Sequence, residues 1–373
     1  ARASAPAAEP VAGAAAKSTR AVVERLPIAK LVGQRVIVSY EGAEPPQQLF
    51  DLIRKGYVAG VIFFGANTNE DPALTRQVAM RMQRARLAAK PKALRRPLLL
   101  MTDQEGGLVR RLPGEPELSE WQISARRNAA GAAGKAGAGA ARTLAAAGIN
   151  VNLAPVLGVQ RPGSSFLGQF QRAYARWRNP RKVGKLAKAF VTQLQRRGVA
   201  ATSKHFPGLG AATEKQDTDA APVTLRLSQR TIDRIDLVPY PWVIAARTKL
   251  VMVNNAVYPS LDPTRPASLS RPIIEGILRR RLGYRGVTIT DALEAGALAP
   301  FGGIPHRGVL AAEAGDDLLL FSQQKLIEGI NGSEALRTAL RSGRLDRDRF
   351  ERAALRVLKL RGQLQVKPSR PLP

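Results

Sequence analysis

The sequence predicts an α/β fold, a single (β/α)8 barrel of the TIM type, and three observations support it. Eight short apolar runs recur along the 373 residues. Each run is continuous instead of alternating, which is typical of strands buried on both faces. A helix-bearing connection follows each run, and this repetition favours a parallel sheet. Eight such units suit a closed barrel.

The predicted strands and helices alternate along the chain. The strands are expected at 35–40, 60–64, 97–102, 149–154, 199–203, 250–254, 286–290 and 317–321. The helices are expected at 46–55, 72–89, 123–147, 180–197, 228–249, 271–282, 306–314, 323–342 and 346–364. Pro239 and Pro241 should break the helix at 228–249, because proline removes a backbone donor.

An open doubly wound sheet is the alternative architecture. The spacing Gly208-x-Gly210-x-x-Thr213 resembles a dinucleotide-binding turn. The third glycine is missing, however, and Pro207 interrupts the passage from strand to helix. The closed barrel is therefore the preferred prediction.

The composition narrows the classes of function. The chain has 58 Lys and Arg against 29 Asp and Glu, a net charge of +29. These charges are scattered over predicted helices, which favours solvated helix faces, although affinity for an anionic cell-wall polymer is an alternative. Nucleic acid is not expected, because aromatic residues are only 5% and no basic stripe is interleaved with them. With no Cys and two His, a classical zinc enzyme is not expected, and no cofactor is implied.

Two regions are expected along the chain. The Ala- and Pro-rich residues 1–20 are interpreted as a disordered tail that remains after removal of an export signal, and residues 21–373 as the barrel domain. A secreted or cell-envelope location follows from this interpretation. No run of 18 apolar residues occurs, so no transmembrane helix is expected.

Polar residues follow the ends of four predicted strands, where barrel enzymes carry their chemistry. They are Asp103, Glu105, Lys204, His205, Asn254, Asn255 and Asp291. Two carboxylates near a Lys-His pair suit glycoside hydrolysis, in which one carboxylate attacks the sugar and an acid protonates the leaving oxygen. For Asp291 alone, capping of a helix is an equally good interpretation.

Five sequence blocks resemble glycoside hydrolase family 3, in its short, single-domain β-N-acetylhexosaminidase branch. They are DQEGGLVRRL (103–112), GINVNLAPV (148–156), KHFPG (204–208), YPSLDPTRPASLS (258–270) and GVTITDAL (286–293). The resemblance covers roughly residues 28–364 in the family's order. It implies a barrel and retaining removal of β-linked N-acetylglucosamine, for example from peptidoglycan, with β-glucosidase specificity as the alternative.

The resemblance also implies roles for individual residues. Asp291 takes the place of the nucleophile that forms a covalent glycosyl intermediate. Sugar-binding places fall to Asp103, Arg172, Lys204, His205 and Asn255, although Asn255 stands where the branch usually has His.

The general acid/base is where this chain departs from the branch, which uses a loop His in an Asp-[Ser/Thr]-His pattern. Asp217-Thr218-Asp219 stands there instead, and Leu209 replaces the His of the KHFPGH signature. His306 is expected at a helix start. Asp219, or failing that Asp217 or Glu214, would have to act as the acid with a raised pKa, which the positive net charge would oppose. The alternatives are an enzyme limited to good leaving groups, a silent sugar-binding protein, or a turn on a solvent loop.

Overall fold

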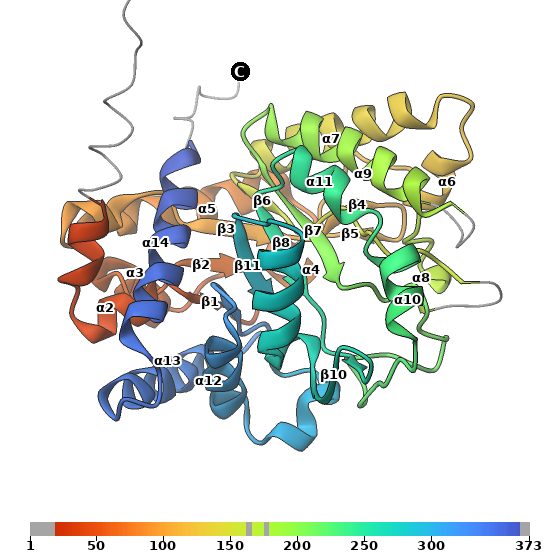
Figure 1. The fold of residues 1–373 in the computed structure, drawn as a ribbon. Helices are drawn as coiled ribbons and strands as arrows, with labels where there is room; N and C mark the ends of the chain where they lie inside the picture. The colour runs from red at the N-terminus through yellow and green to blue at the C-terminus, as the bar shows by residue number, and fades with distance from the viewer. Residues whose placement is uncertain (1–18, 162–165, 175–178, 366–373) are drawn as a thin grey trace, which may run out of the picture.

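Eight parallel strands form a closed barrel in the computed structural model, which describes residues 19–161, 166–174 and 179–365. Figure 1 shows the strands at the centre of the molecule with helices around them. The barrel strands are β1 Val36–Val38, β2 Gly60–Ile62, β3 Leu99–Thr102, β6 Val151–Asn152, β7 Ala200–Phe206, β8 Leu250–Val253, β11 Val287–Thr290 and β12 Leu319–Leu320. All eight predicted strands are therefore confirmed.

Neighbouring barrel strands are consecutive in the chain, and the first strand pairs with the last. Val36 of β1 is in register with Leu319 of β12, and a parallel bridge between Ile289 and Leu318 joins β11 to the β12 segment. Every pairing in this sheet is parallel, so the carboxyl ends of the strands share one face of the barrel. The open doubly wound sheet is excluded.

The helices largely follow the predicted positions. The α-helices are α2 Ile28–Gly33, α3 Gln47–Lys55, α4 Gly65–Thr68, α5 Pro72–Ala85, α6 Glu120–Ser124, α7 Ala129–Ala146, α8 Phe166–Gln169, α9 Pro180–Gln195, α10 Gln229–Thr231, α11 Tyr240–Ala245, α12 Ile304–Ala314, α13 Leu326–Arg341 and α14 Arg347–Gln363. Single turns of 3-10 helix occur at Arg86–Ala88, Lys92–Arg95 and Ala267–Leu269, with a longer one at Gly296–Phe301.

The structure refines three of the predicted helices. The helix expected at 123–147 is two helices, because Ser119 caps α6 and Asn128 starts α7 with a side-chain cap of its own. The segments Ile232–Asp236 and Pro272–Arg281 are π-helical. The break expected near Pro239 is confirmed, since α11 begins only at Tyr240.

Two short hairpins extend the barrel at its carboxyl face. β4 Gln104–Gly106 pairs with β5 Val109–Arg110 directly after β3. β9 Val257–Tyr258 pairs with β10 Asp262–Pro266 after β8. These hairpins build the rim around the site described below.

The core has two layers, one inside the barrel and one between strands and helices. Alternate residues of each strand point to opposite faces, so Ile37 joins the inner layer while Val36 and Val38 join the outer layer. Val357 and Leu360 of α14 also join the inner layer. Burial of both strand faces explains why the runs are continuously apolar.

The packed part of the chain begins earlier than the expected boundary at residue 21. Thr19 is buried and its hydroxyl accepts a hydrogen bond from Arg96 at 2.8 Å. Residues 1–18, which hold most of the expected tail, lie outside the described residues. Within the described ranges, no helix has the length and apolar character needed to cross a membrane.

Candidate active site

A pocket of about 290 Å³ opens at the carboxyl ends of the barrel strands. Its floor is apolar and belongs to the inner core layer, through Ile62, Leu153, Met252 and Leu320. The polar lining includes Asp103, Arg111, Arg172, Lys204, His205, Asp217, Thr218, Asp219, Asp291 and Ser322. Seven of the eight residues predicted as site residues thus share one cavity, and Asn255 is the exception.

A buried cluster of opposite charges forms one wall of this pocket. Lys204 Nζ lies 2.6 Å from Asp103 Oδ1 and 2.7 Å from Glu105 Oε1. Arg172 donates from Nε and from a terminal nitrogen to the two Glu105 oxygens, each at 2.8 Å. Glu105 therefore joins both cations and holds them in a fixed geometry.

The charges in this cluster stabilise one another against burial. Burial works to raise the pKa of Glu105, but Arg172 and Lys204 outweigh it and lower that pKa to about 2. Burial works in the opposite direction on Lys204, whose pKa is nevertheless raised by Asp103 and Glu105. Glu105, Arg172 and Lys204 therefore stay charged at neutral pH, so the wall presents fixed hydrogen-bonding groups to a ligand.

His205 is a neutral imidazole beside this cluster. Burial, with Arg172 and Lys204 nearby, lowers the pKa of His205 well below its ordinary value. Its Nε2 lies 3.5 Å from a terminal nitrogen of Arg172, and its Nδ1 is buried without a hydrogen-bond partner among the described residues. A neutral ring of this kind has one N–H donor and one acceptor nitrogen, so it can bind a hydroxyl, but it does not carry the second proton of an imidazolium at physiological pH.

Asp291 lies at the end of β11, on the pocket wall. Its Oδ1 accepts a hydrogen bond from the Ala292 amide at 3.0 Å. Burial first, and the neighbouring Asp219 second, raise the pKa of Asp291 to about 7. The two carboxyl groups therefore influence each other's protonation inside one pocket.

The loop that carries Asp217 and Asp219 rests on the segment after β11. The amides of Gly296 and Ala297 donate to the carbonyls of Asp219 and Thr218, at 2.8 and 3.0 Å. Asp217 Oδ1 accepts from the Asp219 amide at 2.8 Å, which folds the turn. These contacts hold the Asp219 side chain at the pocket beside Asp291.

The pKa of Asp219 is raised by burial and by Asp217, although Arg172 and Lys204 oppose the shift. The expected opposition by positive charge is therefore present, but it does not cancel the upward shift. Arg172 and Lys204 are paired with Asp103 and Glu105, which weakens their effect on Asp219.

Asn255 has a different environment from the expected one. Its Nδ2 donates to the Ala292 carbonyl at 2.8 Å, and its Oδ1 accepts from Ser268 Oγ at 2.6 Å. Asn255 is buried and is not among the residues that line the pocket. Its amide supports the backbone next to Asp291 instead of facing a sugar.

The comparison with known proteins decides the family. The profile of the glycosyl hydrolase family 3 N-terminal domain matches residues 27–360. This chain belongs to glycoside hydrolase family 3. The family 3 match covers all eight barrel strands and every residue of the pocket, so this protein is a glycosidase by family.

Two curated relatives illustrate the match. An uncharacterized secreted glycosyl hydrolase of Arthroderma benhamiae is 42% identical over 340 residues, which are 91% of this chain and 94% of that protein. A β-hexosaminidase of Nitrosomonas eutropha is 35% identical over 271 residues, which are 70% of this chain and 73% of that protein.

Solved structures of family 3 enzymes have the same fold. A β-N-acetylglucosaminidase from Paenibacillus sp. strain FPU-7 matches with a TM-score of 0.85 and 34% identity, over 93% of this chain. The match spans 64% of that longer enzyme. A β-N-acetylhexosaminidase from Beutenbergia cavernae matches with a TM-score of 0.77 and 32% identity, over 90% of this chain and 99% of that chain.

Three features of this family 3 pocket were missed or undervalued in the sequence. Glu105 was noticed only as a strand-end carboxylate, yet it is the centre of the charged wall. Arg111 lines the pocket with its Nε buried and unpartnered among the described residues; the signal was an Arg eight residues after Asp103. Phe166 and Phe170 also line the pocket, with ring centroids 6.0 Å apart.

Two other candidates for the general acid/base are not among the residues that line the catalytic pocket. His306 is exposed in the first turn of α12 and is not among the pocket residues. Glu214 is exposed, and it too is not among them. The carboxyl groups of Asp217, Asp219 and Asp291 therefore remain the candidates for proton transfer.

Proposed function

We propose that this family 3 glycosidase removes non-reducing β-linked N-acetylglucosamine with retention of configuration. The observation that carries the proposal is the pair of carboxyl groups, Asp219 and Asp291, in one pocket with a wall of fixed charges. The sugar is inferred from relatives named β-hexosaminidase and β-N-acetylglucosaminidase. Peptidoglycan fragments are the proposed source of that sugar.

In this proposal Asp291 is the nucleophile. Its carboxylate attacks the anomeric carbon, and the leaving oxygen departs as the sugar becomes bound covalently to Asp291. Lys204, Asp103, His205 and Arg172 bind the sugar hydroxyls. Because the cluster is held together before a ligand arrives, the sugar is oriented at little additional entropic cost.

Asp219 is the proposed general acid/base, with Asp217 as a supporting carboxylate. An acid must hold a proton before it can donate one, and burial together with Asp217 raises the pKa of Asp219 above its ordinary value. The proton that Asp219 gives to the leaving oxygen is recovered from the water that hydrolyses the intermediate. In this assignment Asp219 takes the place of the loop His that the resemblance to the hexosaminidase branch implies.

The nucleophile is tested with aryl glycosides. Wild type and Asp291→Ala are assayed on aryl β-N-acetylglucosaminide and aryl β-glucoside. Turnover of the first substrate by wild type and its loss in Asp291→Ala would support the proposal. Faster turnover of the glucoside would move the specificity to β-glucosides, and sugar binding without any turnover by wild type would favour a silent binding protein.

The acid/base is tested with a series of leaving groups. Asp219→Asn should slow substrates with poor leaving groups by about 100-fold or more and affect activated ones far less. Asp217→Asn is the matched variant, with the same change two residues away and a smaller expected effect. Equal slowing across the series would remove Asp219 from the mechanism.

The proposed setting is outside the cytoplasm, at or beyond the cell envelope. The word secreted in the name of the Arthroderma relative supports it. The net charge of +29 would favour contact with an anionic polymer there. Detection of the protein in the culture medium of its source organism is the direct test.

A further inference from the structure

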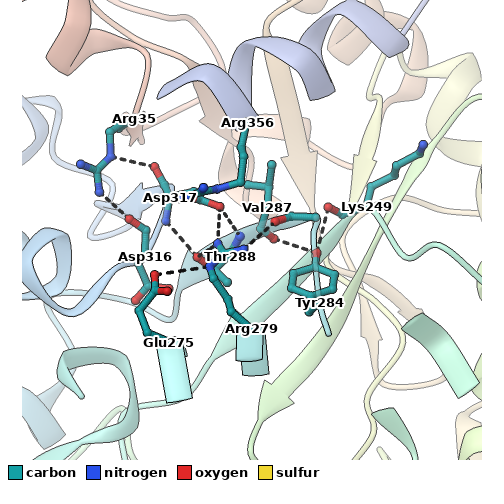
Figure 2. Close-up of polar contacts among 11 residues, drawn as sticks. Arg35, Lys249, Glu275, Arg279, Tyr284, Val287, Thr288, Asp316, Asp317 and Arg356 are labelled. Atoms are coloured by element: carbon teal, nitrogen blue, oxygen red, sulfur yellow. Dashed lines mark hydrogen bonds and ion pairs between the residues drawn. The ribbon is translucent and has the colours of Figure 1, made fainter. Parts of the chain in front are cut away.

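The face of the barrel opposite the catalytic pocket carries a buried ionic network. Asp317 precedes β12, and its carboxylate receives Arg279 at 2.7 Å and Arg356 at 2.7 Å. Arg35 donates to the Asp317 carbonyl at 3.1 Å. Figure 2 shows these three arginines converging on the Asp316–Asp317 segment from separate elements. The network fixes a group of guanidinium groups at the amino ends of the strands.

Three cavities adjoin this network and share residues with one another. Their volumes are about 370, 290 and 370 Å³, and Arg356 lines all three. One of the two larger cavities lies between the others. It shares Arg280 with the smallest cavity, and it shares Tyr284 and Arg285 with the other large cavity. We call this continuous depression the basic groove.

The charge in the basic groove is strongly unbalanced. Eleven Lys and Arg residues line it, against two carboxyl groups, Glu275 and Asp316. Glu275 lies 3.6 Å from Arg279 and Asp316 is fully buried. Arg280, Arg352 and Lys359 are exposed and make no ion pair within the described ranges. The wall of the catalytic pocket differs, because its cations are paired.

Helix α14 gives the groove a linear arrangement of charge. Arg349, Arg352, Arg356 and Lys359 are three, four and three residues apart, which places them along one face of the helix. At the rise of an α-helix this stripe is about 15 Å long. Arg247, Arg280 and Arg285 line the same groove from other segments.

We propose that the basic groove binds a linear phosphate polymer that lacks aromatic bases. Arginine favours phosphate, because its planar guanidinium can donate two parallel hydrogen bonds. A stripe of several cations fits a chain of repeated anions better than a single small ion. The groove is at the end of the barrel opposite the pocket, so a bound polymer would leave the pocket open.

The absence of stacking groups argues against nucleic acid. Tyr284 is the one aromatic residue among those that line the basic groove in the described part of the chain, and its ring is buried. Its hydroxyl donates toward the carbonyls of Lys249 and Val287, so the side chain is committed to the fold. Binding of single-stranded nucleic acid commonly depends on exposed aromatic side chains that stack on bases.

The test uses a labelled short linear polyphosphate and fluorescence anisotropy over a range of salt concentrations. Wild type should bind, with an affinity that falls steeply as salt rises. Arg352→Gln/Lys359→Gln should bind about tenfold more weakly, and its log–log salt slope should be smaller by about 1.4. Turnover of an aryl glycoside should be unchanged, which keeps this result independent of the proposed reaction.

The matched control is Arg226→Gln/Arg230→Gln, which removes the same charge at two exposed positions outside the groove. It should bind polyphosphate as wild type does. Equal weakening by both double variants would assign the binding to net charge alone and overturn the site. No binding by wild type, or tighter binding of oligothymidylate of equal charge, would also overturn the proposal.

Discussion

The amide of Gly296 donates to the carbonyl of Asp219 at 2.8 Å, and this contact joins the two halves of the pocket. Gly296 begins the 3-10 helix that follows β11 and its Asp291, whereas Asp219 belongs to the loop after β7. The backbones come so close that a Cβ on Gly296 would lie 2.1 Å from the Ala220 carbonyl oxygen. The distance between the carboxyl groups of Asp219 and Asp291 therefore depends on the absence of a side chain at Gly296.

Gly296→Ala should displace the loop that carries Asp219. Because a backbone atom occupies the space of the new methyl group, the loop must move and carry the proposed acid away. We expect turnover of substrates with poor leaving groups to fall at least tenfold, with a smaller loss for activated aryl glycosides. Steady-state kinetics on both classes of substrate measure the difference.

Gly303→Ala is the control for that substitution. A Cβ on Gly303 would meet only Pro305, at 3.9 Å, so the loop should keep its place. Similar losses in both variants, or none in Gly296→Ala, would mean that the close approach does not position Asp219.

The pH dependence of the first chemical step should follow Asp291. A nucleophile must be charged, and the pKa of Asp291 is raised to about 7, so kcat/KM for an activated aryl glycoside should rise with pH through about 7. In Asp219→Asn the neighbouring negative charge is absent. The pKa of Asp291 should then fall, and the acidic limb of the profile should move to lower pH.

Asp348→Asn controls for the loss of one negative charge, because Asp348 is exposed in α14 and lies outside the pocket. Its profile should coincide with that of wild type. An acidic limb that stays in place in Asp219→Asn would show that the two carboxyl groups do not interact as we infer.

Glu105→Gln should destabilise the fold more than Asp103→Asn does. Removal of the Glu105 charge leaves Arg172 without its carboxylate partner in a buried wall, at a cost of roughly 3–5 kcal/mol in the free energy of unfolding. The Asp103 side chain is more exposed than that of Glu105. In Asp103→Asn, Lys204 would still be paired with Glu105. Urea denaturation of the three proteins at pH 7 measures the difference.

The effect of Glu105 should also depend on pH. Its folded-state pKa is lowered from 4.5 to about 2, so its stabilising contribution is complete above about 4.5 and is lost as the pH falls toward 2. The difference in the free energy of unfolding between wild type and Glu105→Gln should therefore become smaller as the pH falls from 5 to 3. A gap that is constant with pH would indicate a purely steric effect.

Asn255→Ala should lower kcat more than it raises KM. Its amide holds the Ala292 carbonyl next to the proposed nucleophile, so its loss should disturb Asp291 and leave the sugar contacts in place. Ser268→Ala, which removes the hydrogen bond to the other end of that amide, should have the same effect to a lesser degree. A rise in KM without a fall in kcat would contradict this positioning role and indicate that Asn255 contacts the sugar directly.

The sequence was sufficient to predict the barrel because its strands are buried on both faces. Ile37 and its neighbours Val36 and Val38 are all apolar, although they point into different core layers. Once the strands are parallel and consecutive, their carboxyl ends must meet, which is why Asp103, Lys204 and Asp291 could be assigned to one site before any coordinates.

The remaining features depend on contacts that no local pattern encodes. The π-helical geometry of residues 272–281 does not follow from its apolar spacing, which an α-helix would share. The central position of Glu105 requires Lys204 and Arg172, which are 99 and 67 residues away in the chain, to converge on it. Two hydrogen bonds are also long-range contacts. The Gly296 amide donates to the Asp219 carbonyl, and the Asn255 side chain donates to the Ala292 carbonyl.

The beginning and the end of the described chain are fastened to the same short segment. Arg361 near the end of α14 donates to the carbonyls of Leu94, Arg96 and Pro97, while Thr19 accepts from the Arg96 side chain. Together with the pairing of β1 and β12, these contacts bring both ends of the barrel's polypeptide to one place. A circularly permuted protein, joined by a linker there and opened in an exposed loop elsewhere, should therefore keep all eight strands paired.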